Sequence, residues 1–277
     1  MTDTTSTNDA DGERLDSAEQ RSAVRERYSR IATESSSCCG DDSSCGEASS
    51  AKAQKLGYSA DELDAVSGDA NLNLGCGNPT AIASLEEGDT VLDLGSGGGF
   101  DCFLAAREVG PDGRVIGVDM TPEMVEKARE NVETNAATNV EFRLGEIEHL
   151  PVADESVDVI LSNCVVNLSP DKPQVFREAY RVLRPGGRLA VSDVVLTAEL
   201  PTDLRADPTS VAACVGGAAS VSALEAMLTE AGFTDVSIEP KADSEEFIDE
   251  WDDERDLSDY VVAATIEGEK PATESRP

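Results

Sequence analysis

The sequence predicts an α/β protein built around a mostly parallel sheet, and three observations lead to this fold class. From residue 89 onward, short apolar runs rich in β-branched residues alternate with segments of helical periodicity. A glycine-rich turn, GSGGG, joins the first run to the first helical segment, and an acidic residue, Asp119, ends the second run. Strands and helices that alternate at this spacing form right-handed βαβ units, so their strands lie parallel in one sheet.

The expected strands and helices can be placed in order along the chain. Seven strands are expected, at residues 89–94, 114–120, 140–145, 157–163, 188–195, 234–240 and 259–267. The helices of this part are expected at residues 101–109, 121–135, 171–183 and 220–233. Pro122 near the start of its helix and Gly232 near the end of the last one suit these positions. The last two strands are expected to close the sheet as an antiparallel pair.

Ahead of the sheet, the chain predicts two helical segments separated by loops. Residues 18–34 have helical spacing, and Ser59 with Glu62 gives the signature of a capping box for a short helix within 58–66. The whole chain is expected to divide into a disordered acidic tail at 1–22, an N-terminal helix with Cys-rich loops at 23–87, a cofactor-binding core at 88–195, an acceptor-binding insertion with closing strands at 196–268, and a tail at 269–277.

The chain is strongly acidic. Its 22 Lys and Arg residues against 56 Asp and Glu residues leave a formal net charge of −34. Such a surface repels nucleic acids and anionic membranes, which excludes both as expected partners. Because the acidic residues run through the whole chain, the composition favours a halophilic protein whose self-repulsion is screened by salt. The N-terminus lacks the regions of a secretory signal, and no apolar run reaches about 18 residues, so we expect a cytoplasmic protein. We also expect it to act as a monomer.

The turn at residues 93–99 and two acidic positions outline a ligand site. Glycines in such a turn let the backbone approach a ligand closely. Asp119 stands where a carboxylate can accept two ribose hydroxyls, and an acid in GEIE, residues 145–148, can accept a hydrogen bond from an adenine amino group. No Lys-Ser/Thr pair follows the turn, so the expected ligand carries a ribose and a positive charge but no phosphates.

The combination of DLGSGGG, VIGVDMTPEMVEKAREN, GEIEHLPV and EAYRVLRPGGRLAVSD resembles the class I methyltransferases over residues 88–195. The resemblance implies a Rossmann-like fold with a mostly parallel, seven-stranded sheet and a small C-terminal acceptor-binding extension. It also implies S-adenosylmethionine as the cofactor, which fits the ligand outlined above. The residues that we assign to the cofactor site are Asp93, Gly95, Ser96, Gly97, Asp119, Met120, Glu146, Ile147 and Asn163.

The seven Cys residues must indicate the methyl acceptor, because the class I fold alone names no substrate. Cys164 follows the fourth strand, at the edge where open α/β sheets bind ligands. Cys76 precedes the core, Cys214 follows the fifth strand, and Cys38, Cys39 and Cys45 lie in the N-terminal loop. Cys102, on an apolar helix face, is expected to be a small buried hydrophobic residue. Zinc is a weaker interpretation, since no CxxC pair occurs.

Three segments narrow the resemblance further. NLGCGNP, SNCVVNLSPDKPQVFREAYRVLRPGGRL and CVGGA, which follow a Cys-rich loop and GYSADEL, resemble the arsenite methyltransferases from about residue 23 to the end. This resemblance implies that Cys76, Cys164 and Cys214 hold As(III) as thiolates. It also implies a further functional thiol, Cys38 or Cys39. The short C-terminus implies a reduced version of the family's terminal domain.

The chemistry of arsenic agrees with such a site. As(III) is soft and thiophilic, and three sulfurs around it leave a lone pair that can attack a sulfonium methyl without a general base. Methylation formally oxidises the arsenic, and disulfides among the Cys residues could return it to As(III), with thioredoxin or a small thiol as the reductant. Two other functions stay open: a C- or O-methyltransferase for a quinone or another small molecule, and a thiol protein that sequesters arsenite or a soft metal without turnover.

Overall fold

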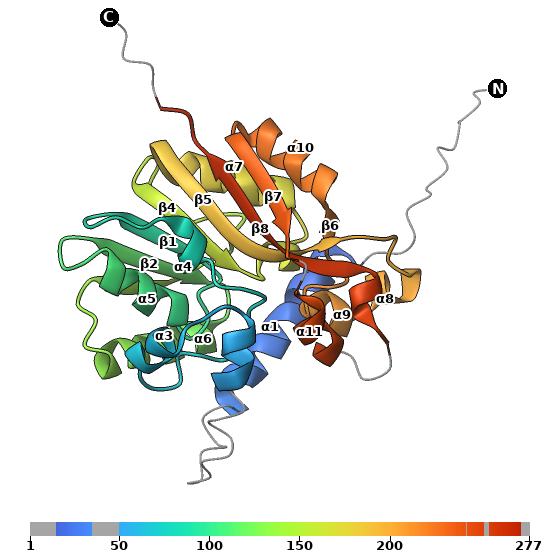
Figure 1. Cartoon of the computed structure of the whole chain (residues 1–277), viewed down its shortest axis with the longest axis horizontal. Coiled ribbons are helices and arrows are strands. Elements are labelled where there is room, and N and C mark those ends of the chain that lie inside the picture. Colours follow the sequence, from blue (N-terminus) through green and yellow to red (C-terminus); the bar gives the residue numbers. More distant parts are fainter. Residues whose placement is uncertain (1–14, 35–49, 242, 252–254, 273–277) are drawn as a thin grey trace, which may run out of the picture.

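One twisted sheet carries the rest of the structure (Figure 1). The computed structural model describes residues 15–34, 50–241, 243–251 and 255–272, and Cys38, Cys39 and Cys45 lie outside these ranges. The strands are β1 (Thr90–Leu94), β2 (Arg114–Asp119), β3 (Val140–Leu144), β4 (Val157–Asn163), β5 (Leu183–Leu196), β6 (Ala219–Ser220), β7 (Thr234–Pro240) and β8 (Val261–Glu269). Their order across the sheet is β3-β2-β1-β4-β5-β8-β7, with β6 paired to β5.

The pairing is parallel from β3 to β5 and antiparallel at the far edge. Strands β1 to β5 run in one direction, whereas β8 runs antiparallel to both β5 and β7. The mostly parallel sheet and its antiparallel closing pair are therefore confirmed. The expected count of seven strands is wrong by one, because Val195 and Leu196 of β5 also pair with the two residues of β6. A two-residue strand is too short to show an alternating pattern in the sequence.

Helices cover both faces of the sheet (Figure 1). On one face lie α4 (Thr80–Ala83), α5 (Phe100–Glu108) and α6 (Pro122–Thr134), and on the other lie α7 (Lys172–Val182) and α10 (Val221–Ala231). Successive side chains of a strand point to opposite faces, so each strand serves two cores. Val91 belongs to the core under α5 and α6, whereas Leu92 and Leu94 belong to the core under α7 and α10.

Shorter helices surround the edge of the sheet at which the parallel strands end. They are α3 (Ala60–Ala65), α8 (Thr202–Ala206), α9 (Pro208–Ala212), α11 (Glu245–Ile248) and the 3-10 turns η2 (Val166–Leu168), η3 (Asp249–Trp251) and η4 (Leu257–Asp259). Helix α3 begins with the expected capping box, in which Ser59 and Glu62 each bond the other's backbone N–H. These caps satisfy N–H groups that a helix start leaves without partners.

The long N-terminal helix α1 (Ser17–Glu34) packs against α6 and α9. It begins one residue before the helical segment expected at residues 18–34, so its first residues overlap the tail expected at 1–22. Asp16 explains the early start, since its Oδ1 accepts hydrogen bonds from the N–H groups of Ala18 (2.8 Å) and Glu19 (2.9 Å).

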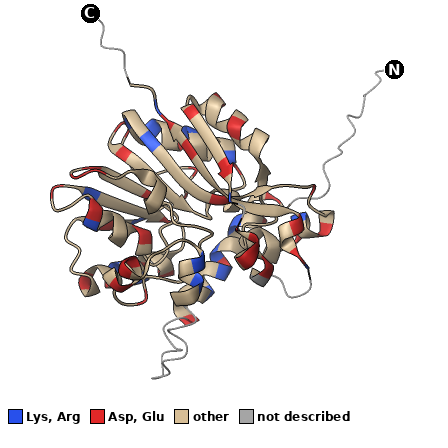
Figure 2. Ribbon diagram, in the orientation of Figure 1, with Lys and Arg blue, Asp and Glu red and all other residues tan. Residues whose placement is uncertain are grey.

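Acidic residues are spread over helices, strands and loops alike (Figure 2). None of the helices in the described ranges combines the length and the apolar character that a membrane crossing requires.

Candidate active site

A cavity opens where β1, β2 and β4 end, and α1 closes one side of it. It encloses about 1070 Å³ of empty space, open solvent at its mouth included. The turn after β1, the end of β2 and the end of β4 supply one wall, while Arg21, Val24 and Tyr28 of α1 supply another. This is the position at which open α/β sheets bind their ligands.

The glycine-rich turn forms the floor of this cavity. Gly95 and Gly97 have φ angles of 69° and 49°, in the left-handed region that favours glycine. A Cβ atom on Gly95 would lie 2.4 Å from Cγ2 of Val165, so the close approach of these segments requires glycine. A Cβ atom on Gly97 would meet nothing within 4 Å, which leaves room for a ligand against the turn.

Two of the predicted carboxylates line the cavity and are deeply buried. Asp119 accepts hydrogen bonds from the backbone N–H groups of Gly97 (3.0 Å) and Thr121 (2.8 Å), and burial raises its pKa. Burial also raises the pKa of Asp93 well above its usual value, and the charge of the neighbouring Asp101 adds to this. Carboxylates held at such a cost favour a ligand that brings positive charge or hydrogen-bond donors.

Asp101 and Tyr58 belong to the same wall, and sequence reasoning missed both. The Tyr58 hydroxyl donates to Oδ1 of Asp101 at 2.6 Å, and Nδ2 of Asn163 lies 3.3 Å from Oδ2 of Asp101. Burial raises the pKa of Asp101 to about 6, although both hydrogen bonds lower it. For Asp101 the sequence did offer a signal, because it is an acidic residue in the first turn of the helix that follows the glycine-rich turn.

Eight of the nine residues assigned to the cofactor site line the cavity: Asp93, Gly95, Ser96, Gly97, Asp119, Met120, Ile147 and Asn163. Glu146 is not among the lining residues, and it faces Arg21 and Arg25 of α1 instead. Glu148 lines the cavity two residues later, and its Oε1 accepts a hydrogen bond from Ser169 Oγ at 2.7 Å. Of the two acids in GEIE, the second is therefore the one that reaches the cavity.

The lining residues fit S-adenosylmethionine. Of the described residues that line the cavity, Arg21 alone is basic, and it lies 3.3 Å from Glu148. Four carboxyl groups face a space that holds no phosphate-binding Lys, while the buried Ser96 Oγ has no partner within the described ranges. A cationic ligand that carries hydroxyl and amine donors satisfies this set.

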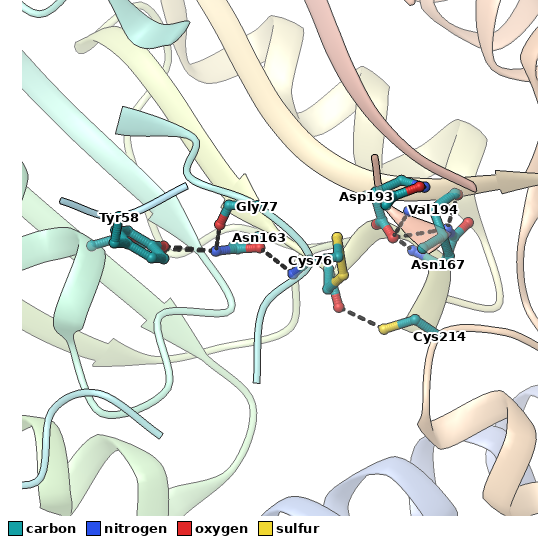
Figure 3. The surroundings of a disulfide bond; sticks show 12 residues. Tyr58, Cys76, Gly77, Asn163, Asn167, Asp193, Val194 and Cys214 are labelled. Carbon is teal, nitrogen blue, oxygen red and sulfur yellow. Dashed lines mark hydrogen bonds between the residues drawn. A yellow bond between two sulfur atoms is a disulfide. The ribbon is translucent and has the colours of Figure 1, made fainter. Parts of the chain in front are cut away.

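Three of the predicted acceptor thiols converge beside the cavity (Figure 3). Cys76 and Cys164 are joined in a disulfide with their Cα atoms 5.9 Å apart, and Sγ of Cys214 donates to the carbonyl oxygen of Cys164 at 2.8 Å. They come from the loop before α4, the end of β4 and the turn after α9. Cys164 also lines the cavity, so the sulfur cluster borders the cofactor site directly.

The remaining described thiol, Cys102, is buried, as expected, and its Sγ lies 3.2 Å from Oδ2 of Asp93. Cys38, Cys39 and the extra Cys45 fall outside the described residues.

Two residues beside the sulfur cluster, Asp193 and Asn167, were not predicted from the sequence. The ligand atoms of Cys76, Cys164 and Asp193 all lie within 4.8 Å of one another, and all three residues are buried. Asp193 accepts hydrogen bonds from both the backbone N–H and Nδ2 of Asn167 (Figure 3). The burial of Cys214 and the charge of Asp193 both raise the pKa of the Cys214 thiol, which agrees with its role as a hydrogen-bond donor.

Comparison with known proteins identifies the family of this site. A family model described as a methyltransferase domain matches residues 85–232. An arsenite methyltransferase of Halobacterium salinarum is 60% identical over 93% of this chain and 68% of its own length. One of Aquipseudomonas alcaligenes is 47% identical over 58% of this chain and 48% of its own length.

A solved structure agrees with these matches. The crystal structure of CrArsM, an arsenic(III) S-adenosylmethionine methyltransferase from Chlamydomonas reinhardtii, aligns with a TM-score of 0.60. It is 34% identical and covers 82% of this chain and 75% of the other. Given these matches, and above all the first, the chain belongs to the arsenite methyltransferase family of S-adenosylmethionine-dependent methyltransferases.

Proposed function

We propose that this methyltransferase transfers methyl groups to As(III) held by the thiolates of Cys76, Cys164 and Cys214, in a reaction that detoxifies arsenic. One observation carries the proposal: three sulfurs from distant segments meet beside the cavity, and Cys164 belongs both to the cluster and to the cavity wall. Soft thiolates select a soft ion such as As(III). Three sulfur ligands leave arsenic its lone pair, so no residue has to act as a general base.

The cofactor site would be formed by the residues of the cavity wall. Asp119 would accept the ribose hydroxyls, Glu148 or Ser96 the adenine or amine donors, and Gly97 leaves space for the ligand against the turn. When bound, S-adenosylmethionine supplies an electrophilic methyl group on a sulfonium. The chain's own contribution is to orient the arsenic toward the cavity and to exclude water from the buried sulfur cluster.

Because Cys76 and Cys164 are joined in a disulfide, the proposed reaction requires a reductant. Cys76 and Cys164 can bind arsenic only after their disulfide has accepted two electrons and two protons. Methyl transfer leaves arsenic formally as As(V), and two thiolates that form a disulfide give up the two electrons that restore As(III). Thioredoxin or a small thiol would reduce this disulfide again and would itself be oxidised to a disulfide. Cys38 or Cys39 would supply a further thiol from the N-terminal loop.

The first prediction concerns turnover. The pre-reduced protein, incubated with arsenite, S-adenosylmethionine and a thiol, is expected to produce methylarsenicals that chromatography with elemental mass spectrometry detects. Cys164→Ser or Cys214→Ser removes one sulfur ligand and is expected to lower the rate by about 100-fold or more, because the arsenic is no longer fixed facing the cavity. Affinity for S-adenosylmethionine, measured by calorimetry, is expected to stay close to that of the wild type.

Cys102→Ser is the matched control, since it also replaces a buried Cys but leaves the three acceptor sulfurs in place and is expected to bind As(III) normally. Full turnover in both acceptor variants would contradict the three-thiolate site. Arsenite binding without methylation in the wild type would instead support sequestration. Cofactor binding without any arsenite binding would support a different small-molecule acceptor.

A further inference from the structure

The pair Asn167–Asp193 lies behind the sulfur cluster, and neither residue lines the cofactor cavity. Both side chains are almost completely buried, with 1% of each exposed. Asn167 belongs to η2, which follows Cys164 by two residues, and Asp193 belongs to the neighbouring strand β5. The proposed function gives neither residue a role, although polar groups are costly to bury.

The hydrogen bonds of this pair are numerous and short. Oδ1 of Asp193 accepts from Nδ2 of Asn167 at 2.8 Å and from the N–H of Val194 at 2.8 Å. Oδ2 of Asp193 accepts from the N–H of Asn167 at 3.1 Å, and Nδ2 of Asn167 also donates to the carbonyl oxygen of Val194 at 2.6 Å. Three of these bonds fix Asn167 of η2 to β5, and the fourth, from Val194, orients the Asp193 carboxylate within β5 (Figure 3).

The same pair touches the segments that carry all three sulfurs. The carboxylate of Asp193 lies within 4.8 Å of Sγ of Cys76 and Cys164. On the other side, a Cβ atom on Gly217 would lie only 2.1 Å from the carbonyl oxygen of Asn167, so the turn that contains Cys214 packs directly on the backbone of η2. Asn167 thus lies between the Cys164 turn and the Cys214 turn.

Both of these turns hold a Cys in a strained backbone conformation. The φ angles are 56° at Cys164 and 69° at Cys214, in the region that residues with a Cβ rarely adopt. Strain of this kind persists only where surrounding contacts enforce it. At the Cys164 turn those contacts are the bond from the N–H of Cys164 to the carbonyl oxygen of Ser192 (2.7 Å) and the Asn167–Asp193 pair.

We propose that Asn167, locked by Asp193, is a positioning residue that sets the separation of the acceptor sulfurs, so that three thiolates rather than two hold the arsenic. This inference rests on the proposed As(III) site, but the packing of Cys214 that it explains does not depend on arsenic. Asn163 holds the Cys76 segment next to Cys164, because its Oδ1 accepts a hydrogen bond from the N–H of Cys76 at 3.0 Å.

Replacement of the amide tests this role. Asn167→Ala removes the side-chain bonds to Asp193 and Val194, so the Cys214 turn is expected to separate from the Cys164 turn. Arsenic K-edge absorption spectroscopy on the reduced protein is expected to count three sulfur neighbours in the wild type and two in the variant. We expect kcat for arsenite methylation to fall by about 100-fold while affinity for S-adenosylmethionine changes little.

A second measurement needs no arsenic. In the oxidised protein, Cys214 is a buried free thiol, and peptide mapping can follow its alkylation by iodoacetamide. Asn167→Ala is expected to raise that alkylation rate on the order of tenfold, since local opening is easier without the pair. An unchanged alkylation rate would overturn the proposal even if the protein did not methylate arsenite. A faster rate in a protein that binds no arsenite would retain the positioning role and reject the As(III) site.

Three further variants separate positioning from general damage. Asn139→Ala is the matched control, because Nδ2 of Asn139 also donates to two backbone carbonyls, at 3.1 and 2.9 Å, but far from the sulfurs. It is expected to leave the sulfur count and Cys214 alkylation unchanged. Asn167→Asp places two carboxylates against each other, and Asn167→Asp with Asp193→Asn restores a donor to the pair. If the double variant recovers three sulfur neighbours, the positioning role of the Asn167–Asp193 pair is supported. If Asn139→Ala also loses arsenic ligation, the specific role of that pair is overturned.

Discussion

Asp101 is a carboxyl group with good hydrogen-bond partners and no ion pair in the described part of the chain. Its neighbours in the cavity wall, Asp93 and Asp119, are also acidic, and the one basic residue among the described lining residues, Arg21, pairs with Glu148 instead. The wall is therefore least favourable when the cavity holds no cation. The ionised carboxylates of this wall destabilise the empty site, and a positively charged ligand would stabilise them.

The raised pKa of Asp101 gives a prediction for stability against pH. Because its pKa is raised to about 6 in the folded state, mainly by burial, the folded state binds this proton more tightly than the unfolded state does. Its contribution to stability is fully present below pH 4 and is lost as the pH rises through about 6, by about 3 kcal/mol in total. Asp101→Asn lacks this titration.

Denaturant unfolding of both proteins at several pH values between 4 and 7.5 checks this. As the pH rises, the free energy of unfolding of Asp101→Asn is expected to increase relative to that of the wild type. Two pH profiles that run parallel through this range would contradict the assignment.

At the scale of the elements, the site depends on how closely η2 approaches the turn after α9. Gly217 permits this contact, because a Cβ atom there would lie 2.1 Å from the carbonyl oxygen of Asn167, a backbone atom that cannot move by rotation of a side chain. The space between the two turns is thus already filled by main-chain atoms. Any added volume must push the Cys214 turn away from Cys164.

Gly217→Ala is therefore expected to lower the free energy of unfolding by about 1–3 kcal/mol and to reduce arsenite methylation strongly. Gly268→Ala on β8 is the control, since a Cβ atom there would come no closer than 3.4 Å to Phe233. Denaturant titration and the methylation assay measure both effects. Normal activity in Gly217→Ala would show that the separation of the turns can vary without consequence.

The elements themselves were predictable, and the reason is local. These features depend on residues that are close together in the sequence: the strand and helix periods, the glycine turn and the capping box at Ser59. The structure confirms them. Most of the residues predicted for the cofactor site line the cavity, because they follow the ends of neighbouring strands. Glu146 lies outside the cavity lining, because no local pattern tells which side of a loop a carboxylate faces.

The sulfur cluster depends on contacts between distant segments. The resemblance assigned Cys76, Cys164 and Cys214 together, but no spacing could show that they meet, since 88 residues separate the two that are bonded. Asn167 and Asp193 carry no motif of their own. Their role follows only from the register that places β5 beside β4.

For the whole molecule, the dominant feature is a net charge of −34. The acidic residues are distributed over helices, strands and loops, so their repulsion acts on the folded state as a whole (Figure 2). Self-repulsion of this size destabilises a compact state unless counter-ions screen it.

Salt is accordingly expected to raise the melting temperature. An increase in KCl from about 0.1 M to about 1 M shortens the Debye length from about 10 Å to about 3 Å and weakens the repulsion between surface carboxylates. Differential scanning calorimetry measures the shift, and sucrose at equal osmolality controls for solvent exclusion. A melting temperature that does not rise with KCl would show that the acidic surface is not limiting.

The Cys76–Cys164 disulfide also makes a closed covalent ring. The ring spans 88 residues and contains β1 to β4, the part of the sheet that includes the strand ends lining the cavity. In the chain-entropy description, closing a ring of this length stabilises the fold by about 4–5 kcal/mol. Oxidation would therefore convert the enzyme into a resistant resting form, which cannot hold arsenic but outlasts the reduced form until thiols return.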